Sequence, residues 1–167
     1  LKLTSIMRDS YVEIEDYGLD KINHAYAFGG PELTLKTLNE NFDLNIKEFM
    51  SVNFNSLVNI IDKVGGVTVD LSEEELPHIS GINEIGSQLL NGEQALAYSR
   101  IRYASGGDYK RTERQRIVVE AVFNKLKSIK ITEFTSLVNE LLPFVQTNMS
   151  SSDMLKLETD FRFFDSS

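Results

Sequence analysis

The stretch FMSVNFNSLVNIIDKVGGVTVDL, residues 49–71, decides the fold class of this chain. Polar and apolar residues alternate over residues 49–54, which predicts a strand. Apolar residues then recur at helical spacing over residues 57–64, behind an asparagine that can cap a helix. Gly65-Gly66 ends that helix, and residues 67–71 read as a second strand. Strand, helix, glycine turn and strand predict a βαβ unit with a right-handed crossover. We therefore expect an α/β fold, an αβα sandwich around a mixed central β-sheet.

Towards the N-terminus, residues 2–7 and 11–14 alternate as two short strands, and Gly18 closes the hairpin-like unit. A Gly29-Gly30 break then precedes a helix that begins at Pro31, where the missing N–H costs nothing. The glycines could let backbone N–H groups approach an anion. The alternative is a simple helix break.

Towards the C-terminus, residues 72–86 read as an exposed excursion, because they are acidic at first and then rich in Gly and Pro. Glu73, Glu74 and Glu75 could bind a cation, although such a run is usually only solvated. Four helical segments are expected after this segment, at residues 92–101, 110–128, 133–145 and 152–157.

Composition narrows the range of functions. At 167 residues the chain is expected to be one domain, residues 1–167. The absence of cysteine removes disulfides, thiol nucleophiles and thiolate metal sites. A net charge of -8 argues against a broad nucleic-acid surface, so no nucleic-acid partner is expected.

No apolar run has the roughly 18 to 20 residues of a membrane span. The chain begins at Leu1 rather than Met, and we expect a processed or excised domain whose anchor lies outside it.

The stretch YSRIRYASGGDYKRTERQR, residues 98–116, is a basic segment within this acidic chain. It holds five of the seven arginines and has a local charge of +4. Arginine binds phosphate or carboxylate through two parallel hydrogen bonds, whereas lysine offers a point charge. Arg100 and Arg102 precede a Ser105-Gly106-Gly107 turn, and arginines three apart follow it at a helix start, where the helix dipole disfavours cations unless an anion is bound. An anion site is the favoured reading. The alternative is a solvated helix face.

A second candidate site is the Arg8-Asp9 pair, which leaves a predicted strand end, where ligands of sheet proteins gather. A turn-capping Asp9 is the alternative.

Five segments in order resemble the motifs of the LytR-CpsA-Psr family of bacterial cell-wall enzymes. They are SIMRDSYVEI, KINHAYAFGGPELTLKTLN, FMSVNFNSLVNIIDKVGGVTVDL, LNGEQALAYSRIRY and GGDYKRTERQR, from about residue 4 to residue 126. The resemblance implies an αβα fold with a long hydrophobic lipid-binding groove. It also implies a membrane-anchored protein with its catalytic domain outside the cell.

The implied activity is transfer of a glycopolymer, such as wall teichoic acid or capsular polysaccharide, from a polyprenyl-pyrophosphate carrier to peptidoglycan, with Mg²⁺. A non-catalytic regulator that binds phosphorylated lipid or polymer is an alternative, and so is a pyrophosphatase acting on the lipid-linked precursor.

The family's functional positions carry over residue by residue. Asp9 matches a magnesium ligand, and Asp108 matches an acidic position that would act as general base or orient an arginine. The residues that match pyrophosphate-binding positions are Arg8, Lys21, Arg100, Arg102, Arg111 and Gln115, and of these Arg100, Arg102 and Arg111 are counted with Asp108 as catalytic.

Three departures from the family pattern stand out. Met7 replaces the usual Pro and Ser10 the usual Thr, and both changes are conservative at a strand end. The family's upstream strand, whose Asp-Thr or Asp-Ser pair supplies another magnesium ligand, is not in this sequence, so part of the sheet and of the metal site is expected to be missing.

The isoprenoid tail of the carrier would need an apolar channel. Candidate lining residues, each of which could equally be ordinary core, are Leu35, Leu38, Phe49, Phe54, Leu57, Ile61, Val118 and Val122.

Overall fold

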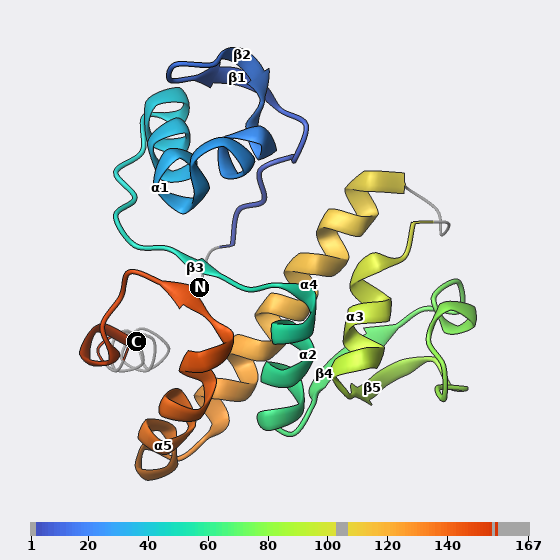
Figure 1. The fold of residues 1–167 in the computed structure, drawn as a ribbon. Helices are drawn as coiled ribbons and strands as arrows, with labels where there is room; N and C mark the ends of the chain where they lie inside the picture. The colour runs from blue at the N-terminus through green and yellow to red at the C-terminus, as the bar shows by residue number, and fades with distance from the viewer. Residues whose placement is uncertain (1–2, 103–106, 155, 157–167) are drawn as a thin grey trace. The chain divides into compact units, whose positions relative to one another are not determined.

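The computed structural model describes residues 3–102, 107–154 and 156, which form two compact units (Figure 1). The larger unit is built mainly from Val52–Gln146, and the smaller from Ile6–Ser51 with Thr147–Met149. The single-domain assignment of residues 1–167 stays a prediction.

Among the described residues, the larger unit combines several helices with a two-stranded sheet. Its helices and strands are, in order, α2 (Phe54–Lys63), β4 (Val67–Leu71), the 3₁₀ turn η1 (Leu76–His78), β5 (Gly86–Leu90), α3 (Gly92–Arg100), α4 (Gly107–Ser128), α5 (Ile131–Leu141) and the 3₁₀ turn η2 (Leu142–Phe144). Strands β4 and β5 are antiparallel, with Val67 opposite Leu90 and Leu71 opposite Gly86. The predicted α/β class is confirmed.

The core of this unit lies between the sheet and helices α2, α3 and α4. Strand β4 buries every second side chain, as expected of a sheet with one face on the core. The buried cluster consists of Ile61, Val67, Val69, Leu71, Ile79, Leu90, Ala95, Tyr98, Ile101 and Val118. Of the candidate channel residues, Ile61 and Val118 are therefore core, and Leu57 and Val122 pack against that core. The lipid-binding groove stays a prediction.

The predicted βαβ crossover is wrong, although its parts are present. Asn53 caps α2 by accepting the Ser56 N–H at 2.8 Å, and the helix ends before Gly65-Gly66 as expected. However, β3 (Met50–Ser51) and β4 belong to different two-stranded sheets. Strand β4 instead pairs with β5. Strand β5 was not predicted, because we expected an exposed segment there, followed directly by a helix. The described residues contain three two-stranded sheets rather than one mixed central sheet.

Helix α3 approaches α2 so closely that only glycine fits at its first position. A Cβ on Gly92 would lie 2.4 Å from the Val58 carbonyl oxygen and 2.8 Å from its Cα, and these backbone atoms cannot rotate away. The Gly92 N–H also donates to Asp62 Oδ1 at 2.7 Å, which joins the two helices. The neighbouring capping box of Asn91 and Gln94 fixes the start of α3.

We therefore expect Gly92→Ala to lower the free energy of unfolding by about 1–3 kcal/mol, the usual cost of overpacking. Denaturant unfolding measures this directly. Glu93→Ala, at the next and exposed position of α3, is the control and should change stability by less than about 0.5 kcal/mol. Equal stability of both variants with wild type would show that α2 and α3 are not packed this closely.

The smaller unit consists of a hairpin, a long helix and a short sheet. Its elements are β1 (Tyr11–Ile14), β2 (Gly18–Lys21), α1 (Ile22–Phe42) and β3, which pairs with β6 (Gln146–Thr147). Strands β1 and β2 are antiparallel. The predicted break is confirmed, because Gly29 and Gly30 have non-helical backbone angles inside α1 and divide it in two. The predicted strand at residues 2–7 is wrong, since residues 3–7 have no regular structure.

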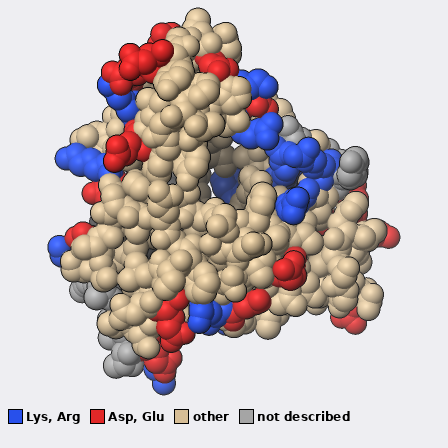
Figure 2. Space-filling view, viewed as in Figure 1, with Lys and Arg blue, Asp and Glu red and all other residues tan. Residues whose placement is uncertain are grey.

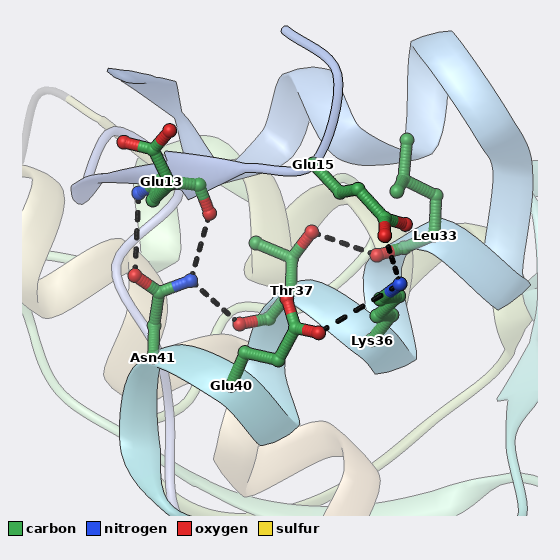
Figure 3. A network of polar contacts seen from close by, with 7 residues as sticks. All are labelled: Glu13, Glu15, Leu33, Lys36, Thr37, Glu40 and Asn41. Atoms are coloured by element: carbon green, nitrogen blue, oxygen red, sulfur yellow. Dashed lines mark hydrogen bonds and ion pairs between the residues drawn. The ribbon is translucent and has the colours of Figure 1, made fainter. Parts of the chain in front are cut away.

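Polar contacts fix the hairpin on the second half of α1 (Figure 3). The Glu13 N–H donates to Asn41 Oδ1 at 3.2 Å, and Asn41 Nδ2 donates back to the Glu13 carbonyl at 2.8 Å. Lys36 forms an ion pair with Glu15, and the fully buried Thr37 hydroxyl donates to the Leu33 carbonyl. Through the hairpin, these contacts position the start of α1.

The predicted Ser105–Gly107 turn and the C-terminal tail lie wholly or mainly outside the described residues. Within the described part of the chain, no helix combines the length and the hydropathy needed to cross a membrane.

Candidate functional site

In the larger unit, candidate residues gather where α3 ends and α4 begins. The two helices lie side by side, and Tyr98 of α3 and Val118 of α4 share the buried cluster (Figure 1). Arg100 is the last residue of α3, Arg102 follows it, and Arg111 and Gln115 lie in the first turns of α4. Figure 2 shows Lys and Arg side chains grouped over the start of α4. The end of α3 and the start of α4 therefore carry concentrated positive charge.

Arg100 is exposed, and its guanidinium lies over the ring of Phe54, with Cζ 4.9 Å from the ring centroid. This cation–π contact orients the fork without using its hydrogen-bond donors. Phe54 itself is 56% exposed, so it is not core, and its role as a lipid contact stays a prediction.

The remaining arginine positions differ in accessibility. Arg102 and Gln115 are exposed and Arg111 is partly buried. Arg111 and Gln115 are four apart on α4, which places them on one helix face. Asp108 lies in the first turn of α4, but its side chain is outside the described part, so its predicted role as base or orienter is not tested.

Arg114 does not join the exposed group, because it is buried in an ion pair with Glu75. The Arg114 Nε lies 2.7 Å from Glu75 Oε1, and the two residues are 5% and 7% exposed. The other oxygen, Oε2, accepts the N–H and the hydroxyl of Ser72, both at 2.9 Å. The prediction that Glu75 belongs to a solvated acidic run is therefore wrong.

The electrostatics of this pair favour the charged state of Glu75. Burial alone would raise the pKa of Glu75, but hydrogen bonds from Ser72 and Arg114 outweigh it, and the pKa lies below its usual value. Burial also raises the pKa of the nearby Tyr98 hydroxyl to about 12, and the negative Glu75 acts in the same direction. The pair thus links α4 to the turn after β4.

In the smaller unit, Arg8, Asp9 and Lys21 lie together at the start of α1. The Ile22 N–H donates to the Ser10 carbonyl at 2.8 Å and the Asn23 N–H to the Arg8 carbonyl at 3.2 Å. These bonds satisfy N–H groups of the first helical turn and hold residues 8–10 against it. The Asp9 carboxylate lies 3.5 Å from both Arg8 Nε and Lys21 Nζ.

The Asp9 carboxylate is accessible and lies beside two cations. Partial desolvation would raise the pKa of Asp9, but Arg8 and Lys21 outweigh it and lower that pKa. No group of three carboxylate or imidazole side chains suited to a metal occurs among the described residues. A lone carboxylate still fits Mg²⁺, which is often held by one or two carboxylates together with substrate phosphates.

The structure thus brings the predicted residues together in two groups, one in each unit. Arg8, Asp9 and Lys21 form one, and Arg100, Arg102, Arg111 and Gln115 the other. That a single pyrophosphate is bound by both groups stays a prediction.

Three contacts at these sites were not predicted from the sequence: Phe54 with Arg100, Glu75 with Arg114, and Asp20 with His24. The position of Glu75 could have been predicted in part. Ser72-x-x-Glu75 before a short helical turn is a capping-box pattern, in which the glutamate side chain bonds back to the backbone. The contact of Asp20 with His24 could also have been predicted, since the two residues are four apart around a helix start. Nothing in the sequence pairs Phe54 with Arg100.

Comparison with known proteins places these features in a family. The polyisoprenyl-teichoic acid--peptidoglycan teichoic acid transferase TagU of Enterococcus faecalis is 36% identical over 167 residues, covering 96% of this chain and 54% of the relative. The crystal structure of a transcriptional regulator from Enterococcus faecalis superposes with a TM-score of 0.80 at 34% identity, covering 92% of this chain and 58% of that one. A structure of TagT bound to LI-WTA gives a TM-score of 0.78 at 32% identity, covering 92% and 59%.

The chain spans about half the length of the curated relatives it matches. The sequence profile of the LytR_cpsA_psr family nevertheless matches residues 1–167, and so includes both groups of candidate residues. The chain therefore belongs to the LytR_cpsA_psr family.

Proposed function

We propose that this chain carries the phosphotransferase site that attaches a glycopolymer, such as wall teichoic acid or capsular polysaccharide, from a polyprenyl-pyrophosphate carrier to peptidoglycan. The observation that carries the proposal is the set of fully or partly exposed arginines at the end of α3 and the start of α4, while Arg114 of the same helix is buried in its ion pair with Glu75. Two comparisons support it: a relative named as a teichoic acid transferase, and TagT bound to LI-WTA.

The arginines act on the charge of the pyrophosphate. Arg100, Arg102 and Arg111 bind its oxygens through their forked donors, and Gln115 adds a neutral donor on the Arg111 face of α4. As the bond to the lipid phosphate breaks, negative charge grows on the leaving oxygen. Donors already fixed in place stabilise that charge without reorganisation.

We assign the group in the smaller unit a phosphate-binding role of its own. Arg8 and Lys21 contact phosphate oxygens, and Asp9 is the residue that would hold Mg²⁺, which supplies charge neutralisation of the phosphates when bound. The role of general base, or of orienter of an arginine, is assigned to Asp108 by family position alone.

We expect Asp9→Asn to raise the Mg²⁺ concentration for half-maximal transfer by about tenfold or more, because the neutral amide is a weaker ligand for a hard cation. Titrating transfer rate against Mg²⁺ measures this. Asp16→Asn, an exposed turn carboxylate in the same unit, is the control and should leave the curve unchanged. An unaltered Mg²⁺ curve in Asp9→Asn would remove Asp9 from the metal site.

The proposal places the site at the outer face of the bacterial cell membrane, where peptidoglycan is the acceptor, with attachment through a segment outside these residues. Its partners are the lipid-linked polymer and the wall. The acidic chain gives no support for a nucleic-acid partner.

The test is transfer of labelled polymer from its polyprenyl-pyrophosphate carrier to insoluble peptidoglycan by the protein with Mg²⁺. We expect label in the washed wall fraction, dependent on protein and carrier. Carrier binding without turnover would make the protein a regulator that recognises the same phosphates. Release of polymer into solution, with none in the wall, would make it a pyrophosphatase.

A further inference from the structure

The smaller unit contains an aspartate–histidine pair that the proposed phosphate contacts do not use. His24, in the first turn of α1, lies with Nδ1 2.8 Å from Oδ2 of Asp20 at the end of β2. The other carboxylate oxygen, Oδ1, accepts the Lys21 N–H at 2.7 Å. Asp20 is therefore held at both oxygens, and its orientation fixes that of the imidazole.

The charge of Asp20 determines which imidazole nitrogen carries the proton. The hydrogen bond with His24 is the largest cause that lowers the pKa of Asp20, and the Lys21 N–H adds to it. An ionised carboxylate only accepts hydrogen bonds, so Nδ1 must be the donor. In the neutral ring Nε2 then carries a lone pair, and no described residue forms a hydrogen bond to it. This is the arrangement by which a carboxylate orients a histidine base.

The position of His24 relates this pair to the phosphate contacts. His24 follows Lys21 by three residues and precedes Phe28 by four, so the three side chains lie along one side of the start of α1. Lys21 lies at one end, beside Asp9. At the other end the ring of Phe28 stacks on Tyr17, with centroids 4.3 Å apart, and its centroid lies 5.8 Å from that of His24.

The pair and its aromatic neighbours face solvent, unlike a core ion pair. The His24 side chain is 41% exposed, and Tyr17 and Phe28 are 53% and 42% exposed. An exposed ion pair of this kind contributes little to stability. Accessible aromatic surface beside an oriented base suits a molecule with an apolar face and hydroxyl groups, which describes a sugar ring.

We propose that His24, oriented by Asp20, is the general base that deprotonates the acceptor sugar hydroxyl, with Phe28 and Tyr17 packing against that sugar. The hydroxyl oxygen forms a bond to the polymer-bearing phosphorus as the bridging P–O bond breaks. The proton passes to His24 Nε2, and the electron pair leaves on the polyprenyl phosphate. This proposal rests on the proposed transferase function. It gives the role of general base to His24 in place of Asp108, whose assignment depends on family position alone.

The experiment measures transfer to peptidoglycan and binding of inorganic pyrophosphate on the same proteins. We expect His24→Gln to lower kcat by about 100-fold or more, the usual contribution of a general base, and to leave pyrophosphate affinity within twofold of wild type. Added imidazole should restore part of the activity of His24→Ala, which a merely structural role would not allow. Asp20→Asn should lower kcat while the fold is kept.

The matched control is His78→Gln, which changes the other histidine of the chain, an exposed residue of the larger unit. It should transfer at the wild-type rate. If the wild-type protein transfers polymer and the rate of His24→Gln is within twofold of the wild-type rate, His24 is not the base. In that case this inference fails while the proposed function stands. If wild type binds pyrophosphate but never transfers, the proposed function fails and this inference with it.

Discussion

Arg100→Ala should reduce glycopolymer transfer by at least about 100-fold, because it removes a fixed, charge-assisted donor from the pyrophosphate as charge develops there. The same loss is expected for Arg111→Ala. Arg100 is exposed and contacts the face of Phe54, so its truncation leaves the buried cluster intact. Transfer rates measured at saturating carrier, together with melting curves for each variant, separate a catalytic loss from unfolding.

Two further variants sharpen this result. Arg100→Lys keeps the charge but loses the planar fork, so it should recover only part of the rate. Lys130→Ala removes an exposed cation at the start of α5 and should transfer normally. Activity near wild type in Arg100→Ala or Arg111→Ala would contradict the role of these arginines.

Glu75→Gln should lower the free energy of unfolding by about 3–5 kcal/mol, because it leaves the buried Arg114 charge without its partner. Glu73→Gln, at an exposed position in the same acidic run, should cost less than about 0.5 kcal/mol. Denaturant unfolding of both variants checks the contrast. A double change to Glu75→Leu with Arg114→Met should lose less stability than Glu75→Gln, since no buried charge remains.

The pH dependence follows from the lowered pKa of Glu75. The unfolded carboxyl, near its ordinary value of 4.5, takes up a proton at a higher pH than the folded one. The ionised Glu75 therefore contributes its full stabilisation of the fold above the unfolded pKa. That contribution is lost as the pH falls through the lower pKa of the folded state. The stability gap between wild type and Glu75→Gln should narrow below about pH 4.5. A constant gap down to pH 3 would show that the charge of Glu75 is not what stabilises Arg114.

Much of this molecule could be predicted from local sequence signals. The cap and helix of residues 53–63, the strand 67–71 and the glycine break in α1 each depend on residues within one turn of each other, and all are confirmed. The α/β class follows from such local signals. The family motifs also named the candidate site residues, whose roles stay predictions.

The errors came from pairings between distant segments. Alternation indicates a strand but not its partner, so it could not reveal that β4 pairs with β5 rather than with β3. Strand β5 was missed because its outward Leu89 breaks the expected alternation of apolar and polar residues. The burial of Glu75 depends on Arg114, 39 residues later, which a count of acidic residues cannot reveal.

The most direct measurement compares two products in one reaction: polyprenyl monophosphate released from the carrier, and labelled polymer joined to peptidoglycan through a phosphodiester. Phosphotransfer predicts equal amounts of both with wild type, and neither above background with Arg100→Ala. Monophosphate release without wall-linked polymer, or unchanged carrier in the presence of Mg²⁺ and peptidoglycan, would contradict the assignment of this site as a glycopolymer phosphotransferase.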